Sequence, residues 1–192
     1  MQLQLDQHAS GNRHSALPSL LHYGGIIASG VADRIPKRLR QLIFLNALML
    51  ESGKSLFSTF PQDVVDQRLK VIRDTGGGVG AVAAFSPTAF SVKDPDDIAW
   101  VARRLTPQPV GTYQQPLMLQ GPIGNNLPRT YIERTDDPLP NLAPSRALVS
   151  RDRDYLRRSL ATDHDAMVTA PAALSDLLLE IASENSVRSI AQ

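Results

Sequence analysis

The 192-residue chain contains no cysteine, which excludes disulfide bonds, cysteine-ligated zinc and a cysteine nucleophile together. It also has no excess of one charge, because 20 Lys and Arg residues against 19 Asp and Glu residues leave a net charge of +1. Nucleic-acid binding needs a basic surface that such a balance does not supply. No apolar run reaches the roughly 18 residues of a membrane span, and the N-terminus lacks a signal-peptide pattern. We therefore expect a soluble cytoplasmic protein that binds neither nucleic acid nor membranes.

Apolar residues make up 42% of the chain, enough for one domain with a hydrophobic core. They form short runs of strand length that alternate with helical patterns. We expect strands at residues 17–21, 41–48, 129–134 and 155–161, and helices at 24–34 and 172–183. With right-handed crossovers, this order predicts an α/β fold with a parallel sheet of three to four strands flanked by helices.

A long insertion, about residues 50–126, separates the second and third of these strands. Helical patterns at 61–73 and 94–105 lie within it, and we expect Trp100 to pack the insertion onto the core. Its glycine run at residues 76–80 lacks both a preceding buried strand and the Gly-Lys-Ser/Thr ending of a phosphate loop. The run is therefore interpreted as a flexible loop.

The segment Leu20-Leu21-His22-Tyr23-Gly24-Gly25, ahead of an apolar helix, is similar to a nucleophile elbow of the form G-x-S-x-G without its serine. Aligned without a gap, His22 takes the serine position and Leu20 replaces the first glycine. If one residue is deleted, His22 is instead the residue before the nucleophile, and the nucleophile position is empty. Both alignments stay open.

Three further segments follow in the order expected of a hydrolase, at residues 40–48, 128–137 and 161–167. Together with the elbow they resemble the hydroxynitrile lyase and plant methylesterase branch of the α/β-hydrolases and its bacterial esterase-like relatives. The resemblance covers about residues 20–184. It implies a hydrolase-like domain at 20–192 with a helical lid at about 50–126, preceded by an atypical segment at 1–19.

Members of that branch have further strands before the elbow. The resemblance therefore predicts an incomplete α/β-hydrolase fold that lacks the N-terminal part. Such a fold would leave the 17–21 strand or the Ile43 strand as an exposed sheet edge, through which two copies of the chain can pair.

The same resemblance implies roles for particular residues. His164, in the loop that carries the family's histidine, is the candidate general base. Asp137 is the matching acid that orients the imidazole, and Asp136 is the alternative one residue earlier. The backbone N–H of Tyr23 would contribute to the oxyanion hole, and His22 would stand at the nucleophile position, where an imidazole can form an acyl intermediate.

Plainer interpretations exist for these residues. His164 alone is also typical of a surface histidine that hydrogen-bonds its neighbours Asp163 and Asp165. Asn46 stands where some relatives have an aspartate, and it cannot serve as a carboxylate. Two imidazoles with Asp137 would suit a metal, but their spacing gives no support for one, so no metal or cofactor is expected.

Two classes of function follow. The first is carboxylesterase-type hydrolysis of a small ester bound under the lid. The alternative is a catalytically impaired or inactive homologue that acts as a binding or interaction protein, since acyl transfer without serine loses its usual nucleophile. Cyanohydrin cleavage of the hydroxynitrile lyase type is a weaker third hypothesis.

Overall fold

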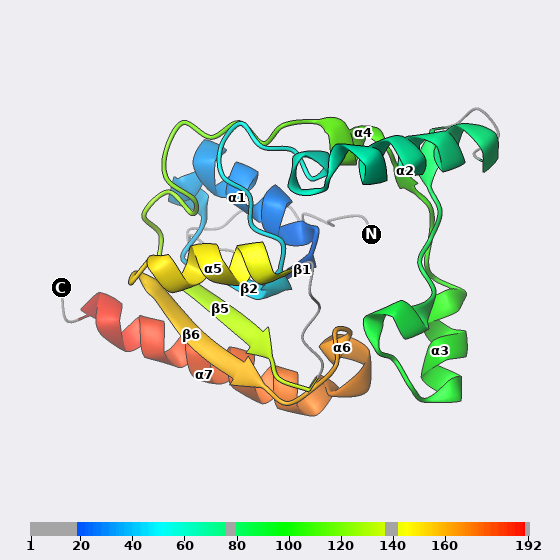
Figure 1. The fold of residues 1–192 in the computed structure, drawn as a ribbon. Helices are drawn as coiled ribbons and strands as arrows, with labels where there is room; N and C mark the ends of the chain where they lie inside the picture. Colours follow the sequence, from blue (N-terminus) through cyan, green and yellow to red (C-terminus); the bar gives the residue numbers. More distant parts are fainter. Residues whose placement is uncertain (1–18, 76–79, 137–141, 191–192) are drawn as a thin grey trace, which may run out of the picture.

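The computed structural model of the chain describes residues 19–75, 80–136 and 142–190 (Figure 1). Four parallel strands form one sheet in the order β1-β2-β5-β6. They are β1 (Ser19–His22), β2 (Leu42–Ala47), β5 (Arg129–Arg134) and β6 (Tyr155–Leu160). The predicted parallel sheet of three to four strands is confirmed.

Strand β2 is an interior strand, hydrogen-bonded to β1 on one side and to β5 on the other. The expectation that the Ile43 strand forms an exposed edge is therefore wrong. Its six residues are all buried, which explains why it is a continuous apolar run rather than an alternating one. Strand β1 lies at one end of the sheet, and pairing between two copies there stays a prediction.

Helices cover both faces of the sheet (Figure 1). Helices α1 (Gly24–Arg34) and α5 (Ala143–Arg151) lie on one face, and α7 (Pro171–Ile190) lies on the other, after the short α6 (Ala166–Thr169). The 3-10 turn η1 (Pro36–Arg38) links α1 to β2. Helix α5 was not predicted, although Pro144 in its first turn is a usual helix-start signal.

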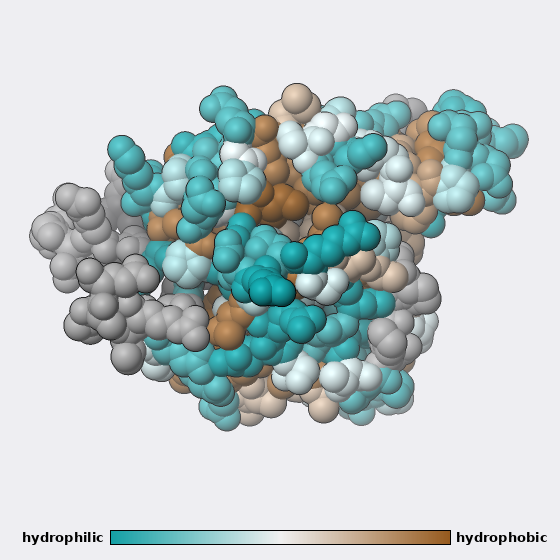
Figure 2. All heavy atoms as spheres, turned by 60° about the vertical axis from the view of Figure 1, so that its left-hand side comes forward, coloured by the Kyte–Doolittle hydropathy of each residue, from teal (hydrophilic) through white to brown (hydrophobic). Residues whose placement is uncertain are grey.

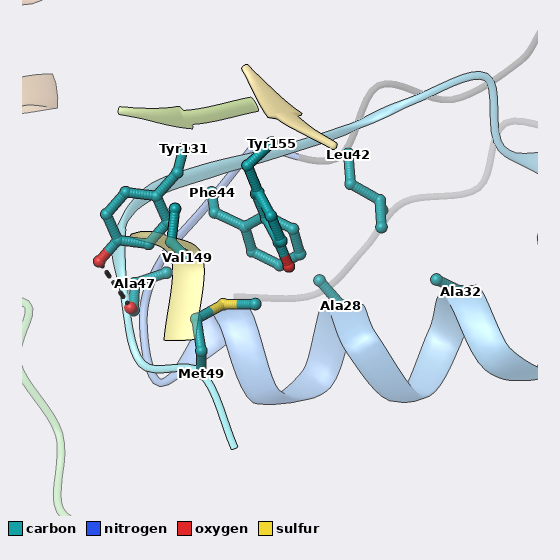
Figure 3. Packing of buried hydrophobic residues seen from close by; sticks show 9 residues of the cluster. All are labelled: Ala28, Ala32, Leu42, Phe44, Ala47, Met49, Tyr131, Val149 and Tyr155. Carbon is teal, nitrogen blue, oxygen red and sulfur yellow. Dashed lines mark hydrogen bonds between the residues drawn. The ribbon is translucent and has the colours of Figure 1, made fainter. Parts of the chain in front are cut away.

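Alternate residues of β2 supply the two cores. Leu42 and Phe44 face α1 and α5, where they pack with Tyr131 and Tyr155 (Figure 3). The hydroxyl of Tyr131 donates to the carbonyl of Ala47 at 3.0 Å, so this buried polar group is satisfied. Ile43 and Leu45, of the opposite parity, point to the other face of the sheet. They form a second cluster with Ile132 of β5, Ala166 of α6, and Leu174 and Ile181 of α7.

The insertion between β2 and β5 consists of short elements. In chain order they are η2 (Phe57–Thr59), α2 (Gln62–Thr75), β3 (Ala81–Val82), η3 (Pro87–Phe90), α3 (Pro95–Ala102), β4 (Gln108–Pro109) and α4 (Gly111–Gln114). Figure 1 shows α2 and α3 set to one side of the sheet. Most of the glycine run interpreted as a loop, residues 76–79, lies outside the described residues.

Trp100 does not pack the insertion onto the core. Its side chain is 44% exposed on α3, and the Arg104 guanidinium lies over its ring at 3.9 Å from the centroid. Apolar side chains of the insertion instead join a third cluster beside α1, which includes Leu56, Phe57 and Tyr113. The expectation for Trp100 fails because α3 turns its tryptophan outward.

Hydrophilic side chains cover most of the face shown in Figure 2, with apolar ones between them in the upper part. None of the helices in the described ranges is long and apolar enough to cross a membrane.

Candidate active site

The ends of all four parallel strands bring one polar group each to the same edge of the sheet. His22 ends β1, Asn46 lies near the end of β2, Arg134 ends β5, and His164 follows β6. Ligand sites of open α/β sheets lie at the carboxyl ends of the strands, because the helices that follow leave a crevice there. These residues are therefore the candidate active site.

His22 lies at the turn between β1 and α1. Its φ of 47° is left-handed, which is uncommon for a non-glycine residue, and helix α1 begins two residues later at Gly24. The pairing of β1 with β2 shifts register between Leu21 and His22, so the strand bulges at this point. The structure therefore places His22 at the turn between β1 and α1, and its role as the residue at the nucleophile position stays a prediction.

Gly25 permits the close approach of α1 to the end of β2. A Cβ atom at this position would lie 2.4 Å from the carbonyl oxygen of Leu48 and 2.8 Å from the Cβ of Ala47. The carbonyl of His22 accepts a hydrogen bond from the Leu48 N–H at 2.8 Å in the same corner. A residue with a side chain at position 25 would collide with the end of β2, so glycine is required for this close approach.

The imidazoles of His22 and His164 contact each other edge to face, with centroids 4.8 Å apart and planes at 87°. Phe90, from η3 in the insertion, stacks on His164 at 5.3 Å, and its carbonyl accepts from the His164 backbone N–H at 3.3 Å. His164 is only 2% exposed, so its interpretation as a surface histidine is wrong. Asp163 bonds instead to the Asp165 N–H and the Thr169 hydroxyl.

Asn46 is the hydrogen-bond partner of His164. Its side-chain nitrogen lies 3.0 Å from Nδ1 of that ring, in a buried contact. In one arrangement the amide N–H donates to Nδ1; with the amide turned over, Nδ1–H donates to the amide oxygen. Only the second arrangement leaves a lone pair on Nε2, the nitrogen that a general base would use. Sequence reasoning had set Asn46 aside because it is not a carboxylate.

Burial keeps both imidazoles neutral at physiological pH. Desolvation, helped by the positive charge of Arg134, lowers the pKa of His22 to about 4. Burial lowers the pKa of His164 to about 3, and the positive charges of His22 and Arg134 add to this shift. Burial and the neighbouring Asp163 raise the pKa of Asp165 to about 6, although Arg134 opposes that shift. Arg134, which is 3% exposed, lies within the 128–137 segment but was given no role from the sequence.

The predicted acid is not placed by the structure. Asp137 lies outside the described residues. The alternative Asp136 is exposed, and its carboxylate accepts from the Thr135 hydroxyl rather than from His164. Ser29 of α1 does not supply a nucleophile in the place of the missing serine, since it is buried and its hydroxyl donates to the carbonyl of Gly25.

Tyr23 lies at the N-terminus of α1, where backbone N–H groups have no helical acceptor. Such groups are the usual donors of an oxyanion hole. Its ring stacks on Tyr113 of α4 with centroids 6.2 Å apart, and its hydroxyl donates to the carbonyl of Thr112. The side chain thus ties the elbow to the insertion, and the role of its N–H stays a prediction.

A pocket of about 370 Å³ opens beside His22. This volume is within the usual range for small-molecule sites. The walls are mostly apolar and come largely from the insertion: Leu48, Leu56, Thr59, Phe60, Arg68, Phe85, Ala89, Phe90 and Tyr113 complete the lining. The site can therefore hold a small apolar molecule against the His22 imidazole. No three His, Asp or Glu side chains in the described ranges are grouped to hold a metal ion.

Known proteins resemble the chain in sequence, although no family model matches it. A carbendazim hydrolyzing esterase from a Nocardioides species is 33% identical over 118 residues, which are 57% of this chain and 48% of the esterase. A putative chloroplastic methylesterase of Arabidopsis thaliana is 24% identical over 172 residues, which are 83% of this chain and 44% of that protein. The chain thus spans about half the length of the curated relatives it matches.

Solved structures resemble it in fold. An extracellular α/β-hydrolase from a Paenibacillus species superposes with a TM-score of 0.66 at 16% identity, over 85% of this chain and 70% of that chain. At this identity the likeness concerns the fold alone. The chain therefore has an α/β-hydrolase fold, and the resemblance to esterase-like α/β-hydrolases that its four segments indicated is confirmed.

Proposed function

We propose that the chain is an esterase-type hydrolase that cleaves small apolar esters slowly, with His22 in place of the nucleophilic serine. The observation that carries this proposal is the placement of His22. The left-handed elbow holds its imidazole against the pocket on one side and against His164 on the other. Similarity to a carbendazim hydrolyzing esterase and to a putative methylesterase supports an ester as the substrate class.

In the first step, Nε2 of neutral His22 attacks the ester carbonyl carbon, since its Nδ1 is buried. Backbone N–H groups at the start of α1, beginning with Tyr23, stabilise the oxyanion. The tetrahedral adduct then expels the alkoxide. The proton on Nδ1 of His22 passes to Nε2 of His164 and on to the alkoxide, which leaves as the alcohol.

Water completes the cycle. It attacks the acyl-imidazole, which is intrinsically labile. Its proton returns through His164 to Nδ1 of His22, and the carboxylic acid is released. Nδ1 of His22 and Nε2 of His164 are both buried, and neither has a hydrogen-bond partner within the described residues. Proton exchange between them therefore requires the two contacting rings to move into hydrogen-bond geometry.

Hydrolysis of a short-chain nitrophenyl ester tests the proposal, with His22→Ala and His164→Ala prepared identically. We expect low activity in the wild type and its loss in both variants. Loss in His164→Ala alone would point to another nucleophile, and equal rates in all three proteins would remove the catalytic proposal.

The alternative, a protein that binds such molecules without cleaving them, is favoured by one observation. His164 is almost completely buried beneath Phe90, so access of water to it is limited. Binding of a non-hydrolysable amide with no turnover of the matching ester would support this alternative.

A further inference from the structure

The pocket beside His22 contains a cation that the proposed chemistry does not use. Arg68, on α2, lines the pocket and is half-buried. Its guanidinium lies over the Phe60 ring, 4.7 Å from the centroid, so its orientation is fixed by a cation–π contact rather than by an acidic residue. No Asp or Glu of the described ranges lies within ion-pair distance of it, in contrast to Arg129 and Arg158.

A hydroxyl donor accompanies this cation. Tyr113 lines the same pocket, and its phenol is close enough to Arg68 for the positive charge to act on its pKa, although burial leaves that pKa raised overall. None of the hydrogen bonds among the described residues uses the Tyr113 hydroxyl. The other hydroxyl of the lining, that of Thr59, already donates to the Leu56 carbonyl at 2.7 Å.

The remaining wall is apolar and aromatic, with Phe85 and Phe90 edge to face at 5.9 Å. A ligand that suits the whole pocket therefore has an apolar body and one anionic group. A guanidinium and a hydroxyl together match the two oxygens of a carboxylate, and hydrogen bonds of this charged kind are stronger than neutral ones.

We propose that the pocket is a carboxylate-binding site, in which Arg68 and Tyr113 hold the acid group of an aryl or alkyl carboxylic acid while the apolar walls enclose its body. This inference rests on the proposed function only because both use the same pocket. It extends that function by naming a substrate or product that carries a free carboxylate.

Calorimetric titration with two matched probes tests the site. 3-Phenylpropionate and 3-phenylpropionamide have the same shape and differ in charge. We expect the acid to bind the wild type at least tenfold more tightly than the amide. Arg68→Gln should abolish this preference while changing amide affinity less than twofold. Arg73→Gln removes the same charge from an exposed position of the same helix and should retain the preference.

A second measurement covers the case in which Arg68→Gln does not fold. Raising NaCl from 20 to 500 mM should weaken binding of the acid to the wild type but not of the amide, because salt screens the charge contact. Equal binding of acid and amide, or a preference that survives Arg68→Gln, would overturn the carboxylate site and leave the pocket for neutral esters intact. Absence of binding by both probes would overturn the carboxylate site alone, because hydrolysis of the nitrophenyl ester tests the proposed function separately.

Discussion

The imidazole of His22 at the elbow of β1 meets the imidazole of His164 in the loop after β6 edge to face, with centroids 4.8 Å apart. In a hydrolase with an intact elbow, the residue at this turn is the nucleophile and the histidine is its base. Here both residues of the pair are imidazoles, and neither carries a hydroxyl. That they stand at the positions of nucleophile and base stays a prediction.

Restoring the hydroxyl is the most direct test of this relationship. We expect His22→Ser to raise hydrolysis of a short nitrophenyl ester about 10- to 100-fold above the wild type, because His164 can then act as a general base for a serine. His22→Ala is the matched control, since it creates a similar cavity without a nucleophile. A His22→Ser variant no faster than His22→Ala would show that His164 cannot serve as a base from its buried position.

Asn46 gives a second test, since it is the only described partner of His164 Nδ1. In Asn46→Asp, a carboxylate would replace the amide oxygen and favour the imidazolium, so the pKa of His164 should rise by about 1 to 3 units. NMR titration of the histidine ring protons measures this shift. Asp136→Asn is the control and should leave the His164 pKa unchanged, because Asp136 is exposed and bonded to Thr135. A shift in Asp136→Asn instead would identify Asp136 as the acid.

Gly25 should be among the least replaceable residues of the elbow. In Gly25→Ala the added methyl group would clash with the Leu48 carbonyl oxygen and the Ala47 side chain, at an expected cost of about 2 to 3 kcal/mol in the free energy of unfolding. Gly30→Ala, in the same helix, has its nearest contact at 3.6 Å and should be neutral or stabilising by up to about 1 kcal/mol. Urea denaturation of both variants measures the difference, and equal stabilities would contradict the close approach.

The neutral histidines should make the fold sensitive to acid. Because the pKa values of His22 and His164 are depressed to about 4 and about 3, the unfolded chain binds more protons than the folded one between those values and about 6.5. The free energy of unfolding should therefore fall as pH decreases from about 6 to 4. Partly exposed Asp165, whose pKa is raised to about 6, binds its proton more readily in the folded state and offsets part of this loss.

The net slope expected from these three groups is about 1 to 2 kcal/mol per pH unit. Chemical denaturation at several pH values, compared between the wild type and His22→Ala, isolates the histidine contribution. The variant should lose stability more gradually with acid. Parallel curves would show that His22 is not a source of the acid sensitivity.

Local patterns predicted the elements of the sheet closely. Helix 24–34 and strand 129–134 have the predicted bounds, and the strands expected at 41–48 and 155–161 differ from the observed ones by a residue at one or both ends. Trp100 was misplaced because an amphipathic pattern gives the period of a helix but not the surface against which it packs. Exposed Trp100 is instead held by Arg104 of the same segment.

The sequence by itself determined the fold class, the elbow without a serine and the two histidines, because strand and helix periodicity and short motifs are local properties of the chain. It left open which residue occupies the turn, and it could not assign Asn46 to His164, Arg134 to the histidine pair, or Arg68 to the pocket. Only the tertiary structure decided these, since parallel pairing brings the carboxyl ends of β1, β2, β5 and β6 together from distant parts of the chain. Burial at that edge, which no single segment encodes, then sets the protonation of His22 and His164.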